Sequence, residues 1–81
     1  MTNQPNVDPA SIAKSIMDEG AKVTAAMQML EAATSEMEAA LTLNNWDEVE
    51  KARQKCVSRY EAVLDARIIA VKYLRDKYRP S

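Results

Sequence analysis

The chain has 81 residues, of which 47% are hydrophobic and 28% charged, and its net charge is −1 at pH 7. This length allows one domain at most, near the lower limit for burying a self-sufficient core. The near-neutral charge gives no general attraction to nucleic acid or anionic membranes. With no histidine and the single Cys56, an internal disulfide is excluded, and we expect no metal or cofactor. A partner chain is then the expected source of extra stability.

The sequence predicts neither a membrane span nor a cleaved secretory signal. It contains no run of about 18 apolar residues, which a transmembrane helix needs. Its first residues lack both the basic and the apolar region of a signal peptide. We therefore expect a cytoplasmic protein, while export by a route without a cleaved signal stays open.

The first helix is expected over residues 9–43. Residues 1–8 are polar and contain Pro5, so we predict a disordered tail there. The tail ends in Asp8-Pro9, and Asp is a strong N-cap while Pro suits the first helical position.

Apolar residues of the first helix follow a heptad pattern. We assign position d to Ile16, Val23, Leu30 and Met37, and position a to Ala13, Gly20, Met27, Thr34 and Leu41. Alanine pairs recur every seven residues, at 25–26, 32–33 and 39–40, and this register places them on one flank of the seam. Small flanks let another helix approach closely, so we expect this helix to contact more than one neighbour. The alternative is that the alanines only favour helix on a solvated face.

A turn is predicted at residues 43–46. Asn44 and Asn45 tolerate left-handed backbone and bond locally, and Asn45 with Glu48 resembles a capping box. The second helix is expected from Trp46 to Arg79, with residues 80–81 as a short tail. Its apolar stripe is Trp46, Val49, Cys56/Val57, Tyr60, Val63/Leu64, Ile68, Val71, Leu74 and Tyr78.

Two helices of similar length joined by a short turn predict an all-α, antiparallel two-helix hairpin. The charges support this pairing. Residues 9–43 carry two basic and five acidic residues, whereas residues 46–79 carry nine basic and six acidic ones. The first helix is therefore net negative and the second net positive.

Both apolar stripes are wider than one seam requires. Exposed surplus apolar surface indicates an interface, so we expect a bundle of four or more helices, formed by self-association or by docking onto a partner. The predicted partner-binding residues are Met17, Val23, Met27, Met29, Leu30, Ala33, Met37, Ala40, Leu41 and Trp46. Two alternatives remain: Met27 and Met37 can be ordinary core residues, and Trp46 can clamp the turn instead of anchoring a partner.

Catalytic chemistry is not indicated. Without histidine there is no imidazole base and no triad, and no glycine-rich loop could hold a phosphate. Cys56 lies on the apolar stripe, where a buried, inert thiol is the usual outcome. We therefore expect no enzyme and no catalytic residues.

The basic residues of the second helix suggest an alternative function. A small dimeric regulator could bind RNA or DNA through them. Acidic residues are interleaved with the basic ones, however, and the basic residues do not fall on one stripe, which is typical of a solvated mixed-charge face.

Part of the second helix resembles the needle subunits of bacterial type III secretion systems. The similar residues are Gln54-Lys55-Cys56-Val57-Ser58-Arg59-Tyr60, Ala66 and Val71-Lys72-Tyr73-Leu74-Arg75-Asp76. Those subunits are helical hairpins that stack into a filament, but they have a Pro-containing turn and a longer apolar tail. The Trp46-Asp47 pair also resembles one in small flagellar and type III export chaperones, which shield an export partner with an apolar face. These resemblances imply a component or chaperone of a secretion apparatus.

Overall fold

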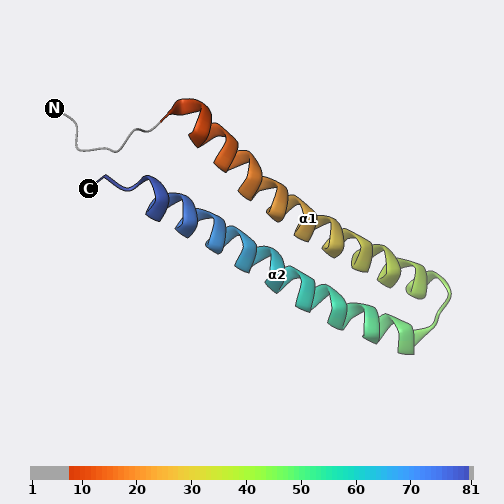
Figure 1. Cartoon of the computed structure of the whole chain (residues 1–81). Coiled ribbons are helices and arrows are strands. Elements are labelled where there is room, and N and C mark those ends of the chain that lie inside the picture. Colours follow the sequence, from red (N-terminus) through yellow and green to blue (C-terminus); the bar gives the residue numbers. More distant parts are fainter. Residues whose placement is uncertain (1–7, 81) are drawn as a thin grey trace.

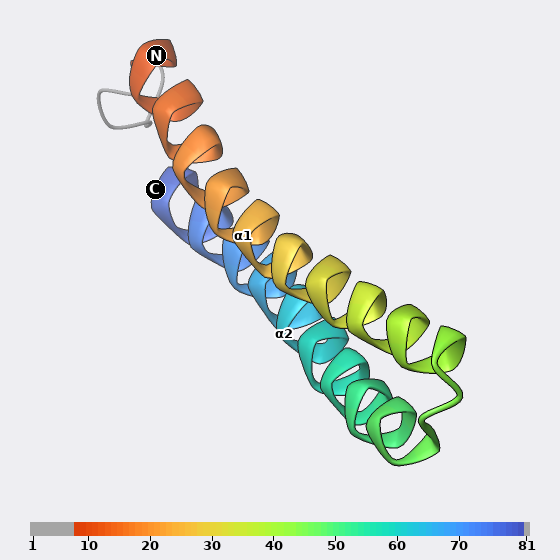
Figure 2. The ribbon, with the colours of Figure 1, turned by 90° about the vertical axis from the view of Figure 1, so that its right-hand side faces the viewer.

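A computed structural model describes residues 8–80 of the chain. Two helices, α1 (Pro9–Thr42) and α2 (Trp46–Tyr78), lie antiparallel and side by side along their length (Figures 1 and 2). The predicted all-α hairpin is confirmed. Its Cα atoms span 66 × 19 × 9 Å, so the molecule is a slab one helix thick. The expected disordered tail lies outside the described residues, apart from Asp8.

The start of α1 follows from its first two residues. The Asp8 side chain accepts a hydrogen bond from the Ala10 N–H at 3.2 Å, which satisfies one of the donors that a helix N-terminus leaves open. Pro9 occupies the first helical position, where its missing N–H is no loss. Both helices end one residue before the expected positions, at Thr42 and Tyr78.

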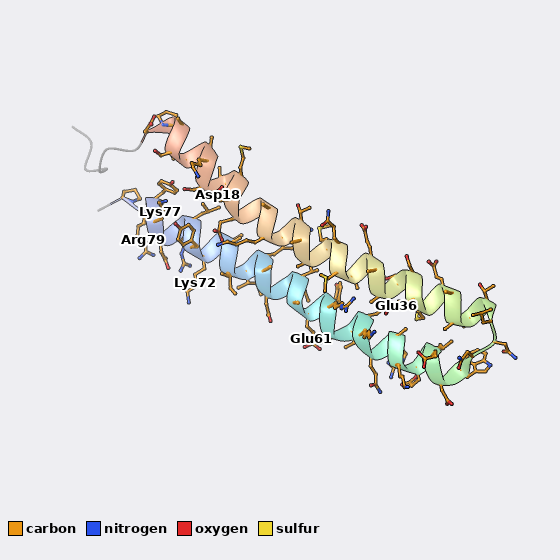
Figure 3. The ribbon with its side chains drawn as sticks, turned by 45° about the vertical axis from the view of Figure 1, so that its right-hand side comes forward. Asp18, Glu36, Glu61, Lys72, Lys77 and Arg79 are labelled. Atoms are coloured by element: carbon orange, nitrogen blue, oxygen red, sulfur yellow. The ribbon has the colours of Figure 1, made fainter. Side chains whose placement is uncertain are left out.

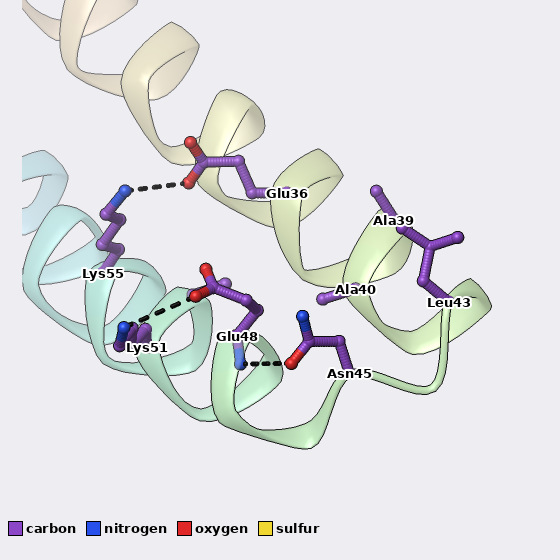
Figure 4. A pocket seen from close by; sticks show the side chains of 9 residues that line it. Glu36, Ala39, Ala40, Leu43, Asn45, Glu48, Lys51 and Lys55 are labelled. Carbon is purple, nitrogen blue, oxygen red and sulfur yellow. Dashed lines mark hydrogen bonds and ion pairs between the residues drawn. The ribbon is translucent and has the colours of Figure 1, made fainter.

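The turn between the helices is held by its own hydrogen bonds. The N–H of Asn45 donates to the carbonyl of Ala40 at 2.9 Å, so the chain folds back over the last turn of α1. Asn44 adopts φ of 57°, the left-handed region that Asn tolerates better than most residues. The Asn45 side chain then accepts from the Glu48 N–H at 3.3 Å and caps α2 (Figure 4).

The buried part of the seam between the helices consists mainly of small side chains. The buried apolar residues are Ala33, Ala40, Ala52, Val63 and Ala70, and no large side chain is fully buried among residues 8–80. Alanine lets two helix backbones approach closely, as in the tight contacts of small-residue interfaces. Alanine side chains bring little apolar area into the seam. Because each buried CH₂ group contributes about 0.8 kcal/mol, the hydrophobic stabilisation from the seam is small.

This seam corrects the heptad register expected for α1. The second alanine of each pair, exemplified by Ala33 at 0% exposure, faces α2 together with the half-buried Val23, Leu30 and Met37. The row assigned to position a lies instead on one broad side of the slab, where Gly20, Met27 and Leu41 are exposed. A close helix pair has room for alanine at the buried centre of the contact, and the valine, leucine and methionine that α1 contributes to the seam are only half-buried.

The single apolar stripe expected for α2 is in fact two stripes. One, in the seam, contains Val49, Ala52, Cys56, Val63, Ala70, Leu74 and Tyr78, all buried or half-buried. The other is exposed and contains Trp46, Val57, Tyr60, Leu64, Ile68 and Val71. Because α2 packs against only one helix, it cannot bury both stripes within the hairpin.

Candidate protein-binding surface

One broad side of the slab, which we call the apolar face, carries a row of residues from each helix. The rows are recognised by their alternating spacing of three and four residues, which keeps them on one side of a helix. The row of α1 is Gly20, Thr24, Met27, Glu31, Thr34, Glu38 and Leu41, and the row of α2 is Trp46, Glu50, Arg53, Val57, Tyr60, Leu64, Arg67 and Val71.

Two shallow hollows show that the rows form a continuous surface. In the first, Met27 of α1 lies beside Tyr60, Leu64 and Arg67 of α2. The second lies nearer the open end and is lined by Ile16, Gly20 and Val23 of α1 with Arg67, Ala70, Val71 and Leu74 of α2. Arg67 borders both hollows, and its Nη2 lies 3.8 Å from the Met27 sulfur, a weak acceptor. Large apolar side chains are therefore open to solvent at both hollows.

The opposite side, which we call the polar face, is held by charged groups that bridge the helices. Lys55 Nζ of α2 lies 3.2 Å from a carboxylate oxygen of Glu36 on α1 (Figure 4). Farther along, Arg59 donates from Nη1 to the backbone carbonyl of Met29 at 2.9 Å. Such exposed pairs contribute about 0.2–1 kcal/mol each, so they orient the helices more than they stabilise them.

A polar cluster joins the helices at the open end. The hydroxyl groups of Ser15 and Tyr78 lie 2.7 Å apart, and Lys77 Nζ donates to the Ser15 oxygen at 3.0 Å. One turn farther, the buried Glu19 carboxylate accepts from Lys22 at 2.9 Å. This hydrogen bond is the main reason why the pKa of Lys22 is raised. Buried polar groups at this end thus have partners, as burial requires.

The ten predicted partner-binding residues do not form one surface. Met27, Leu41 and Trp46 are exposed and lie on the apolar face. Val23, Leu30 and Met37 are half-buried along the seam, while Ala33 and Ala40 are buried against α2. Met29 lies on the polar face, and Met17 follows the buried Ser15 by two residues and so points away from α2.

The prediction included only Trp46 from the α2 half of the apolar face. It omitted Tyr60, Leu64 and Val71, which contribute large side chains there and are all exposed. Their spacing of four and seven residues marks a common side of a helix, one residue along from the seam row of Val63 and Ala70. Reading α2 as two parallel rows would have revealed them.

The basic side chains of α2 face in several directions. Lys51 and Lys55 line a groove on the polar face, where each lies within ion-pair distance of a glutamate (Figure 4). Arg67 lies on the apolar face. Near the end of α2, Lys77 lies against α1, whereas Lys72 points away from it (Figure 3). The described part of the chain therefore presents no single basic stripe.

Residues 8–80 contain no cluster of three or more side chains suited to hold a metal ion. Cys56 is half-buried in the seam, with its sulfur 3.9 Å from the Thr34 hydroxyl oxygen. Over the same residues, neither helix has an apolar stretch long enough to cross a bilayer.

Comparison of the chain with protein-family models, with curated proteins and with solved structures found no match.

Proposed function

We propose that the chain is a non-enzymatic protein-binding module whose apolar face docks against helices on the surface of another protein chain. The observation that supports this is the contrast between the two apolar layers. The buried residues of the seam are mostly alanine, and most of its larger side chains are only half-buried, whereas the solvent-exposed face contains Met27, Leu41, Tyr60, Leu64 and Val71. A chain that folded for its own stability alone would bury the large side chains first.

The energetic gain from covering this face is substantial. Burying a leucine-sized side chain contributes about 1.5–3 kcal/mol, more than the burial of an alanine methyl group in the seam. Val57, Tyr60 and Leu64 follow one another in the row of α2, and Met27 lies beside the last two in the first hollow. Contiguous exposed apolar surface is a feature of interaction sites. A helical partner fits because both rows run parallel to the long axis of the slab.

A bacterial secretion apparatus is the setting we propose, with the chain as a component or a chaperone. The support is the resemblance of residues 54–76 to needle subunits and of Trp46-Asp47 to export chaperones. An open apolar face suits either role, since a component packs against its neighbours and a chaperone covers an apolar segment of its cargo. The alternative of a nucleic-acid-binding regulator has less support, because the basic side chains of α2 point in several directions.

The proposal can be tested by site-specific photo-cross-linking in the native cell. A photoreactive residue at Leu64, on the apolar face, should form adducts with protein, whereas one at Ile69, on the opposite side of α2, should form few. Adding Tyr60→Lys to the Leu64 probe should abolish its adducts, which excludes random collisions. Equal adducts from both positions, or none from Leu64, would contradict the proposal. A salt-dependent shift with RNA or DNA would favour the alternative.

A further inference from the structure

Resting on the proposed function, we infer that the apolar face binds a second copy of this chain. The two copies lie parallel, with both turns at the same end, and form a four-helix bundle in which α1 of each copy packs against α2 of the other. Three features of the structure lead to this arrangement: the charges on the two rows, the heights of their residues, and the position of Gly20.

The charges on the face determine which helices are neighbours. The row of α1 carries only acidic charges, Glu31 and Glu38, and neither has a cation within 4.0 Å among residues 8–80. The row of α2 carries Arg53 and Arg67 with one acidic residue, Glu50, which pairs with Arg53, so that row is net positive. Packing α1 on α1 would set one net-negative row against another, whereas packing α1 on α2 sets a net-negative row against a net-positive one. In a face-to-face two-fold dimer, only an axis parallel to the helices gives this pairing.

The contacts inside the hairpin give the height of each residue along the slab. Glu36 pairs with Lys55, and Thr34 lies beside Cys56. A residue of α1 and a residue of α2 at the same height therefore have residue numbers that add up to about 90. Rotation about an axis parallel to the helices keeps these heights. Met27 of one copy then meets the partner's Leu64, and Glu38 meets the partner's Arg53. Each contact occurs twice, as symmetry requires.

Gly20 provides an independent reason for a close neighbour. Glycine inside a helix costs about 1 kcal/mol relative to alanine, yet a Cβ atom at this position would have nothing within 4 Å in the hairpin. No contact of the chain itself therefore requires glycine there. At the same height on the partner stands the exposed Val71, and Gly20 leaves a hole into which such a side chain fits.

Sedimentation equilibrium of the full chain tests the dimer. The wild type should have twice the monomer mass of 9.0 kDa at micromolar concentration. Leu64→Lys should give a monomer, whereas the matched Ile69→Lys on the other side of α2 should stay dimeric. Loss of the dimer in both variants, or in neither, would overturn the inference.

Gly20→Gln separates association from folding. Glutamine favours helix more than glycine does, so circular dichroism should show at least the wild-type helix content. Because the side chain fills the hole, association should weaken about tenfold or more. Unchanged association would overturn the proposed packing at this position.

Disulfide trapping tests the orientation. Chains with Met27→Cys and chains with Leu64→Cys, both also carrying Cys56→Ala, are mixed in a glutathione redox buffer. The parallel arrangement predicts a mixed disulfide between the two kinds of chain. A control mixture of Met29→Cys and Ala62→Cys chains, altered on the polar face, should give none. Disulfides only between identical chains would overturn the parallel arrangement.

These results are distinguishable from failure of the proposed function. A wild type that is monomeric throughout the micromolar range, but still forms a Leu64 photo-adduct with a different protein, overturns the second copy as occupant and leaves the protein-binding module standing. A monomer without any adduct overturns both.

Discussion

The hydroxyl oxygen of Tyr78 lies 2.7 Å from that of Ser15, so the last turn of α2 is joined to the start of α1 across 63 positions of sequence. The Tyr78 hydroxyl also donates to the Ser11 carbonyl at 3.1 Å. It has one hydrogen to give, and the Ser15 hydroxyl must therefore be the donor in the shorter contact. With Lys77 donating to Ser15, a chain of hydrogen bonds closes the end of the hairpin opposite the turn.

Tyr78→Phe should destabilise this end. It removes two hydrogen bonds, each contributing about 0.5–1.5 kcal/mol, so we expect a loss of about 1–3 kcal/mol in the free energy of unfolding, measured by urea titration. Amide exchange should accelerate near Ser11 and Tyr78 but not near the turn. Tyr60→Phe is the control, since that hydroxyl makes no hydrogen bond within the described residues. Equal losses for both variants would show that the cluster does not hold the helices together.

The alanine pairs provide a test of the seam. Ala33 is fully buried, so Ala33→Leu should force the helices apart and lower the free energy of unfolding by about 1–3 kcal/mol. Its neighbour Ala32 is exposed, and Ala32→Leu should change the stability by less than about 0.5 kcal/mol. Thermal unfolding followed by circular dichroism measures both. A larger effect at Ala32 would mean that the helices meet through the other member of the pair.

The turn depends on the left-handed backbone of Asn44. At φ of 57°, a β-branched residue is strained, so Asn44→Val should destabilise the hairpin by about 1–2 kcal/mol. Asn44→Gly should retain or slightly raise stability, because glycine adopts this conformation without strain. Chemical denaturation of both variants is the measurement. If valine and glycine were equivalent here, the turn geometry would have no energetic importance.

The Glu50–Arg53 pair predicts a dependence on acid. The hydrogen bond from Arg53 is the main reason why the pKa of Glu50 lies below its ordinary 4.5. A lowered pKa means stabilisation that is present above pH 4.5 and lost as the pH falls through the lower, folded-state value. Glu50→Gln should therefore be less stable than the wild type at neutral pH, with the difference vanishing in acid.

The same glutamine substitution in an Arg53→Gln background is the control for this pH effect. With the guanidinium gone, Glu50→Gln should leave the urea midpoint unchanged at every pH. A persistent difference would assign the effect to another partner of Glu50.

The hairpin could be predicted because the signals that start its first helix and form its turn are local. Asp8-Pro9 caps the first helix through one side chain and one fixed dihedral angle, and Asn44-Asn45 makes the turn through bonds to its own neighbours. Such signals depend on two or three adjacent residues. They need no knowledge of what the helices pack against.

The register of the seam could not be predicted as easily, because it depends on how closely two helices approach. The predicted register placed the large apolar residues Met27 and Leu41 in the seam between the helices, whereas the structure has Ala33 and Ala40 there. Both rows of α1 have the same seven-residue spacing, and spacing alone does not separate them. The same ambiguity merged the seam row and the exposed row of α2, which is why the prediction included only Trp46 from the α2 row of the apolar face.

Residues Pro9 and Tyr78 lie together at one end of a slab 66 Å long, while Asn44 lies at the other (Figure 1). A fluorescent protein or affinity tag attached near the start of α1 or the end of α2 would therefore lie close to Tyr78, far from Asn44 and Trp46. The distance between dyes at positions 9 and 46 would report the full length of the molecule. The distance between dyes at positions 9 and 78 would report only whether the two helices stay together at this end.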